Sequence, residues 1–311
     1  METVIDIILA AGHSALDVSL YTLLPIMVVM TIVLRLLEVY GVLKWVIALL
    51  DPVIRPFGLQ GLGGLAILQS TLISFVAPLP TLKMIESRGT SDRILAASFA
   101  GVLASAPANA TYPLSRFGLS IGLTVCLSIF GALIASTSTY WIFGRKLTSK
   151  DYPSSYTEIE EQTHRPSLVT IINTSGGQAV QSILAIIPML LVSLAVVFAL
   201  EKVGLVAFLT YLLSGSLAAV GIDANIILPT VTKYLAGNSA MVAVLFDMAK
   251  QPGFNPAVVS RGSGFLINPL DLPGLGIFAT AGPRLIKVIP YAMAGGAVGI
   301  AMRAVVTPIL M

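Results

Sequence analysis

Long apolar runs alternate along the chain with shorter stretches that are rich in proline, glycine and polar residues. The runs at 18–37, 117–143 and 183–200 contain one charged residue between them, Arg35, which lies close to the end of the first run. The hydrocarbon core of a bilayer accommodates about 20 helical residues, so each run is long enough to cross it. The pattern therefore predicts several membrane-spanning helices.

The same order of distinctive residues occurs twice in the chain. Matches between leucine or valine residues carry little information in so apolar a sequence, whereas matched proline, glutamate and glycine residues in a constant register indicate a duplication. Four pairs are 163 positions apart, and two later pairs are 164 apart: Pro25 and Pro188, Glu38 and Glu201, Gly41 and Gly204, Gly58 and Gly221, then Met84 and Met248, Gly89 and Gly253.

The duplication divides the chain into a first membrane repeat at 1–143, a hydrophilic linker at 144–180 and a second membrane repeat at 181–311. In the first repeat we expect an interfacial helix at 3–14, a spanning helix at 18–37, an amphipathic helix at 41–56, half-helices at 65–76 and 81–88, a short helix at 92–107 and a long helix at 114–143. The second repeat follows the same plan. The predicted fold class is an all-α polytopic membrane protein with two inverted repeats and broken or re-entrant helices.

Each repeat closes with a long apolar helix that carries a GxxxG motif. The motifs are Gly118 with Gly122 and Gly295 with Gly299. Glycines at this spacing permit close approach of two membrane helices, and they also occur as ordinary packing residues.

Composition supports a lipid environment and excludes several classes of function. Apolar residues make up 56% of the chain and charged residues 11%, which leaves too few polar side chains to cover a soluble fold. The net charge of +3 is scattered, so we expect no nucleic-acid partner. The single cysteine, Cys126, excludes an intramolecular disulfide. The two histidines, His13 and His164, have no metal-ligand partner at suitable spacing, and no nucleotide-binding or hydrolase motif occurs, so we predict that the chain is not an enzyme and holds no metal.

Both repeats contain two stretches in which proline, glycine and polar residues interrupt a helix. An unpaired backbone group costs several kcal/mol in lipid, so such breaks persist only where protein or a hydrated cavity receives the freed groups. Corresponding breaks in two halves are the best sequence pointer to the binding site of a transporter. The candidate solute-binding residues at these breaks are Gln69, Ser70, Ser74, Thr81, Ser105, Asn109, Asn238, Ser239, Asn268 and Asp271.

Most of these candidate side chains are neutral and both donate and accept hydrogen bonds. They suit an uncharged polar solute, or an ion held weakly by oxygen ligands, with Na⁺ or H⁺ as the coupling ion. The alternative is that they cap half-helices or form bonds between helices. Asp271 is the strongest ionisable candidate, because charged groups inside a membrane are usually functional. If the candidates bind solute, Asn109→Ala and Asn268→Ala should each abolish uptake without preventing folding.

One segment resembles a known domain. The run from Pro78 to Gly89, followed by Arg93, Ser98–Gly101 and Ser105–Ala108, is similar to the Gate or nucleoside-recognition domain of concentrative nucleoside transporters, ferrous-iron permeases and the spore maturation proteins A and B. The resemblance implies inverted helix-hairpin repeats around a central site, a bacterial or archaeal plasma membrane, and often an oligomer. The GTPase domain of the iron permeases is absent, and Cys126 does not lie where their conserved cysteine does, which argues against iron as the solute.

The leading hypothesis is a membrane permease or secondary transporter for a small polar solute, nucleoside-like solutes included, that works by alternating access between the two repeats. Its partners would be the lipid bilayer, the solute and further copies of the chain, in the cell's plasma membrane. The alternatives are a membrane scaffold or partner subunit that transports nothing, and an ion permease gate. A carrier should show saturable stabilisation by its solute, whereas a scaffold should instead co-purify with a partner protein.

Overall fold

A computed structural model describes residues 2–40, 52–151, 167–205, 224–279 and 281–311, together with positions 42, 45, 208, 211 and 212. Within these ranges every regular element is a helix, which agrees with the predicted all-α class. Most of the predicted amphipathic helix at 41–56 lies outside the described residues.

The first repeat begins with a helix that continues without interruption from Glu2 to Val39. The backbone at the junctions Leu16 and Leu24 is helical, so the expected boundary between an interfacial helix at 3–14 and a spanning helix at 18–37 is absent. Neither glycine nor proline stands at 14–19 to end the helix. The elements of this repeat are α1 (Glu2–Leu16), the π-helical η1 (Asp17–Leu23), α2 (Leu24–Val39), α4 (Gly61–Leu72), α5 (Leu79–Ser87), α6 (Asp92–Ala104), α7 (Ala108–Leu114) and α8 (Ile121–Trp141).

The second repeat has the same order of elements. They are α9 (Leu168–Lys202), α11 (Ile227–Met248), α12 (Ala257–Leu266), α13 (Leu272–Ala279) and α14 (Pro283–Leu310). Inside α11 the backbone leaves the helical region at Gly237, where φ is 87°, so α11 is a pair of half-helices like α4 and α5. Gly89 and Gly253, which the sequence pairs at 164 positions, both follow the second half-helix and both have positive φ.

The predicted linker at 144–180 is shorter in the structure, because α9 already begins at Leu168. Ser167 starts this helix by accepting a hydrogen bond on Oγ from the backbone N–H of Thr170 at 3.2 Å. The first turns of α9 look loop-like in sequence because they are polar and contain Gly176 and Gly177. Two of their polar residues, Ser175 and Gln178, line the cavity described below, whereas Asn173 and Thr174 are exposed.

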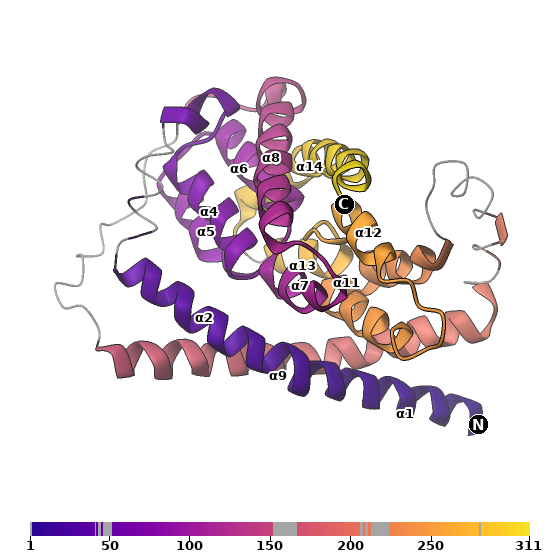
Figure 1. Cartoon of the computed structure of the whole chain (residues 1–311). Helices are drawn as coiled ribbons and strands as arrows, with labels where there is room; N and C mark the ends of the chain where they lie inside the picture. Colours follow the sequence, from indigo (N-terminus) through magenta and orange to yellow (C-terminus); the bar gives the residue numbers. More distant parts are fainter. Residues whose placement is uncertain are drawn as a thin grey trace.

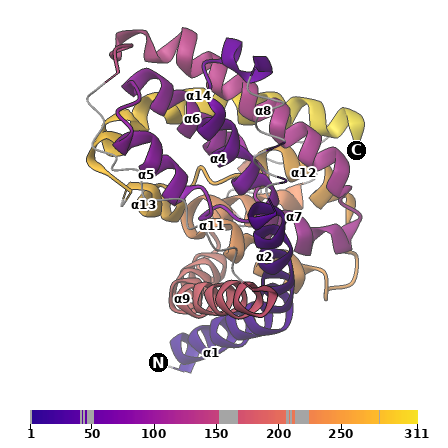
Figure 2. The same cartoon turned by 90° about the vertical axis from the view of Figure 1, so that its left-hand side faces the viewer.

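The helices form two layers (Figures 1 and 2). The continuous helix α1–α2 packs against α9 on one side of the molecule, and the broken helices with α8 and α14 lie on the other. The helices α6, α8 and α14 pack against one another in this second layer. Consequently the two repeats contribute to both layers.

Polar contacts join the amino-terminal helix to the end of α11. Ser14 Oγ donates to Asp247 Oδ2 at 2.5 Å, and the Lys250 ammonium lies 3.0 Å from Asp247 and 3.4 Å from Asp17. The hydrogen bond to Asp247 raises the pKa of Lys250 above its ordinary value. Lys250 follows the last turn of α11 and lies outside the segments that are long and apolar enough to cross a membrane.

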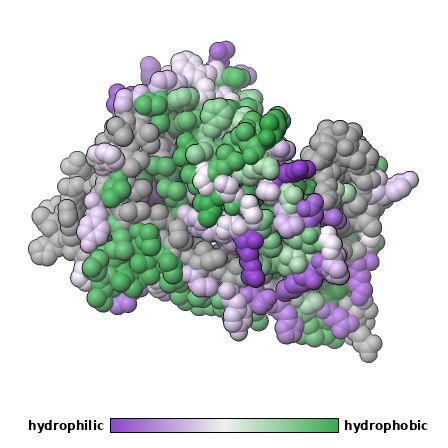
Figure 3. All heavy atoms as spheres, viewed as in Figure 1, coloured by the Kyte–Doolittle hydropathy of each residue, from purple (hydrophilic) through white to green (hydrophobic). Residues whose placement is uncertain are grey.

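Among the residues that the structure describes, four helical segments are long and apolar enough to cross a membrane: Val4–Tyr21, Asp92–Phe117, Ile121–Lys146 and Pro283–Leu310. Large apolar side chains remain exposed on their outer faces, among them Phe130 and Trp141 on α8 and Val305 on α14. Figure 3 shows apolar residues over α8 and hydrophilic residues gathered toward the end that holds the amino terminus. The chain is therefore a membrane protein whose outer apolar surface faces lipid.

The two GxxxG motifs differ in what they contact. A Cβ built on Gly299 would lie 2.3 Å from the carbonyl oxygen of Gly131, and one on Gly295 would lie 2.7 Å from that of Ala135. The second motif therefore brings α14 against α8, as the motif permits. No described atom lies within 4 Å of a Cβ built on Gly122, so the first motif makes no such contact there.

This difference gives a matched pair of variants. We expect Gly299→Ala to lower the free energy of unfolding by about 1–3 kcal/mol, because the added methyl group must push backbone apart in a packed core. We expect Gly122→Ala to be neutral or slightly stabilising, since alanine favours a helix over glycine. Thermal unfolding of the purified proteins in detergent checks both, and equal melting temperatures for the two variants would contradict the assignment.

Candidate solute-binding cavity

The half-helices α4 and α5 form the first hairpin, and the interruption at 105–107 between α6 and α7 is the first break. Contacts between this hairpin and the broken helix α6–α7 hold the first break in place. Thr81 Oγ1 donates to Gln69 Oε1 at 2.7 Å, across the two half-helices of the hairpin. The backbone N–H of Phe75, at the hairpin tip, donates to Asn109 Oδ1 at 3.3 Å. Ser105 Oγ donates to Ser70 Oγ at 2.6 Å. The hairpin tip is therefore positioned by side chains of the broken helix.

A cavity of about 540 Å³ lies beside this hairpin, between the two layers of helices. It is within the volume range of sites for small organic molecules. Its polar lining comes from both repeats, and apolar residues of α4, α5 and the hairpin tip complete the wall. The polar lining residues are Arg35, Gln69, Ser74, Thr81, Asn109, Ser175, Gln178 and Ser239.

The structure brings together five of the ten predicted site residues in this cavity: Gln69, Ser74, Thr81, Asn109 and Ser239. Ser70 and Ser105 are fully buried where the first hairpin meets the first break, and they do not line the cavity. Asn238, Asn268 and Asp271 gather at the second break, likewise away from the cavity lining. A role in binding solute stays a prediction for all ten residues.

The interruption at 267–271 between α12 and α13 is the second break. A buried cation on α11, which the sequence analysis missed, lies against it. Lys233, with 0% of its surface exposed, donates from Nζ to Asn268 Oδ1 at 2.6 Å and to the carbonyl oxygen of Leu270 at 2.7 Å. Its ammonium lies 3.8 Å from Asp271 Oδ2. Asn238 Nδ2 donates to the carbonyl oxygen of Asn268 at 2.8 Å. A lysine within an apolar segment, four positions before Gly237, was a signal available in the sequence.

Arg303 on α14 is the second missed residue, and it joins the two breaks. Its side chain is 1% exposed, and Nη1 donates to the carbonyl oxygens of Ala104 at 2.8 Å and Ile267 at 3.0 Å. Ala104 ends α6 and Ile267 follows the end of α12. The guanidinium therefore satisfies carbonyl groups at both interrupted helices, where the helix dipoles favour positive charge.

Charged groups also attach the start of α14 to the first repeat. Arg284 Nε donates to Asp92 Oδ1 at 2.9 Å, and its backbone N–H donates to Glu86 Oε1 at 2.9 Å. Lys287 Nζ donates to Asp92 Oδ2 at 3.1 Å. These contacts fix the end of the first hairpin and the start of α6 relative to the second repeat.

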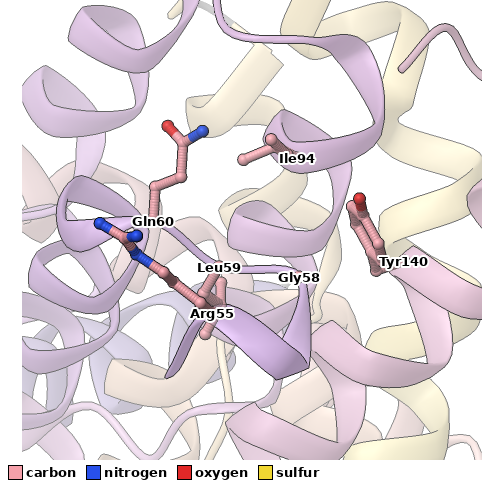
Figure 4. A pocket seen from close by; sticks show the side chains of 6 residues that line it. All are labelled: Arg55, Gly58, Leu59, Gln60, Ile94 and Tyr140. Atoms are coloured by element: carbon pink, nitrogen blue, oxygen red, sulfur yellow. The ribbon is translucent and has the colours of Figure 1, made fainter. Parts of the chain in front are cut away.

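A second cavity, also of about 540 Å³, opens at the surface on another part of the molecule. Figure 4 shows Arg55 and Gln60 on one side of it and Ile94 and Tyr140 on the other. All of its lining residues belong to the first repeat, and none is a predicted site residue. The cavity between the layers is the better candidate site because polar groups from both repeats converge there.

Comparisons with known proteins identify a matching family and a similar fold. Residues 20–140 match the Gate family, which is described as nucleoside recognition. No curated protein sequence matches the chain. Solved structures of the concentrative nucleoside transporter CNTnw share its fold. A variant in an outward-facing state has a TM-score of 0.68 at 17% identity, covering 100% of this chain and 85% of that chain.

The inward-facing, substrate-bound structure of CNTnw has a TM-score of 0.68 at 16% identity, covering 99% of this chain and 83% of that one. A variant in an intermediate state gives 0.65 at 15%, with coverages of 100% and 86%. The chain is thus a helical membrane protein with the fold of a transporter. Its residues 20–140 match the Gate, or nucleoside-recognition, family, which confirms the resemblance, and the shared helical fold confirms the fold class expected from the sequence.

Proposed function

We propose that the chain is a permease for a small polar solute of the nucleoside class, which binds in the cavity between the two helix layers. The observation that carries the proposal is the lining of that cavity. Amide and hydroxyl groups from both repeats converge on it, and they can bond the ring nitrogens and hydroxyl groups of such a solute. The apolar wall, which includes Phe75 and Met84, offers a surface for a flat base.

The position of the cavity supports alternating access. One wall is formed by α2 and α9, and the other by the first hairpin and by residues at the breaks. A shift of one layer against the other would change the side of the membrane to which the cavity opens. CNTnw, whose fold is similar, has been solved in outward-facing, intermediate and inward-facing states. We further propose that the permease acts in the plasma membrane as a homo-oligomer.

Thermal unfolding of the purified protein with nucleosides, nucleobases, amino acids and metal salts tests the proposal. We expect saturable stabilisation by one chemical class, with an increase in melting temperature of about 5 °C when the solute is at about 100 times its dissociation constant. Uptake of the radiolabelled solute into proteoliposomes should then saturate with concentration.

The competing interpretations predict other results. Absence of stabilisation and of uptake, together with a protein that co-purifies in fixed ratio, would contradict the permease and favour a scaffold. Stabilisation by a metal salt alone would favour an ion permease.

A further inference from the structure

The ammonium group of Lys233 occupies a place at the second break that resembles an ion site. Its two nearest partners are neutral oxygens, Asn268 Oδ1 at 2.6 Å and the carbonyl oxygen of Leu270 at 2.7 Å. Asp271 lies farther away, at 3.8 Å, and the ring centre of Tyr234 is 3.9 Å from Nζ. Broken membrane helices coordinate monovalent cations through side-chain oxygens and unwound backbone carbonyls of this kind.

A simple ion pair accounts for this arrangement less well. In a pair, the carboxylate would be the closest acceptor, because charge-assisted hydrogen bonds are the shortest and strongest. Here Asp271 Oδ1 accepts the backbone N–H of Gly274 at 2.7 Å, and Oδ2 supplies the negative charge at a longer distance. The cation is held by the oxygens of the unwound segment and neutralised by a nearby carboxylate, which is how a protein binds a small cation.

The first repeat lacks both charges at the matching positions. Lys233 lies four residues before the break at Gly237, and Gln69 lies four residues before Ile73, the residue that follows the end of α4. Asp271 comes two residues after Pro269, and Asn109 comes two residues after Pro107. The lysine and the aspartate are therefore replaced together by amides. In the first repeat these amides line the cavity, whereas in the second repeat the charged residues lie beside each other away from its lining.

We propose that Lys233 is a tethered cation, which fills a monovalent cation site at the second break and makes a free ion unnecessary there. Removing the ammonium while keeping Asp271 leaves a buried carboxylate and oxygen ligands that a Na⁺ ion can occupy. One consequence rests on the proposed permease function. Solute uptake by the parent protein should change by less than about twofold when Na⁺ is replaced by choline, because no free Na⁺ at this site contributes binding energy. Each 1.4 kcal/mol of such energy would change the affinity tenfold.

The experiment compares three purified variants in detergent. Lys233→Ala opens space for an ion, Lys233→Met removes the charge but keeps the volume of the stem, and Lys233→Ala with Asp271→Asn removes the negative charge as well. Melting temperatures are measured in choline chloride and in NaCl, KCl or LiCl at one ionic strength. We expect Lys233→Ala alone to be stabilised in at least one of the three salts, by about 3 °C with the cation at roughly ten times its dissociation constant.

Two results would overturn the proposal. One is a folded Lys233→Ala variant whose melting temperature is the same in every salt. The other is an equal response of all three variants and the parent, which is a general salt effect. If Lys233→Ala does not fold in choline chloride, folding that is recovered in NaCl, KCl or LiCl and lost on exchange into choline supports the proposal, and failure in all salts contradicts it. None of these measurements requires transport, so a failed uptake assay contradicts the permease alone.

Discussion

Arg303→Met should lower the free energy of unfolding by about 3–5 kcal/mol, which is a large part of the stability of an ordinary protein. The variant leaves the carbonyl oxygens of Ala104 and Ile267 without the donor that now satisfies both. Those groups lie at interrupted helices in the centre of the molecule, where water cannot replace the guanidinium. Because methionine is neutral, the variant no longer buries a charge, and this gain offsets part of the cost. Methionine donates no hydrogen bond, so the two carbonyl oxygens stay without a donor.

We expect the melting temperature of Arg303→Met to fall by about 10 °C or the protein to elute as aggregate, as measured by thermal unfolding and size-exclusion chromatography in detergent. The melting temperature of Arg303→Lys should lie between those of Arg303→Met and the parent, because an ammonium keeps the charge but lacks the planar arrangement of donors of a guanidinium. The control is Arg261→Met on α12, where the side chain is exposed. Similar decreases in melting temperature for Arg303→Met and Arg261→Met would show that Arg303 does not join the two breaks.

Asn109→Ala should reduce uptake of the transported solute by about 100-fold while leaving the protein folded. Asn109 is 6% exposed and lines the cavity, so the loss of an amide that faces a polar solute leaves the solute with an unmatched group. The same side chain accepts the backbone N–H of Phe75, and its removal therefore also releases the hairpin tip. Uptake into proteoliposomes is the measurement, with the thermal-shift response to solute as a second readout.

The matched control is Asn173→Ala on α9, where the side chain is exposed and does not line the cavity. This variant should transport like the parent. Normal uptake by Asn109→Ala would show that the solute does not bind in the cavity between the layers. Asn268→Ala should also abolish uptake, but through the second break, because Asn268 Oδ1 accepts bonds from Lys233 and from the backbone of Leu270.

The prediction of the breaks from sequence succeeded because their causes are local. Proline lacks a backbone N–H, and glycine tolerates a positive φ, so Pro78, Pro107 and Pro269 favour interruptions. Proline alone is not sufficient, because Pro188 and Pro290 lie inside helices. The structure places helix ends at these segments and at Gly237. The beginning of α9 was harder to predict, because polar residues and paired glycines at 173–178 are typical of a loop. Packing against the rest of the protein makes the segment helical.

The roles of Lys233 and Arg303 could not be derived from spacing along the chain. Arg303 is 199 residues from Ala104, and Lys233 is 35 from Asn268. Local rules mark a charged residue in an apolar segment as unusual, but only the folded chain supplies the partners that make its burial tolerable. For the same reason the sequence placed all ten candidate residues in one set, whereas the structure separates five around a cavity from five at buried contacts.

By itself the sequence determined the membrane environment, the all-α class and the positions of the helix breaks, since these follow from apolar content and the backbone chemistry of proline and glycine. The duplication stays a prediction from the periodic matches. The tertiary structure decided which polar groups meet in a cavity and which satisfy each other in the interior. That decision depends on how helices from distant parts of the chain pack, because a polar side chain in lipid must find its partner across space.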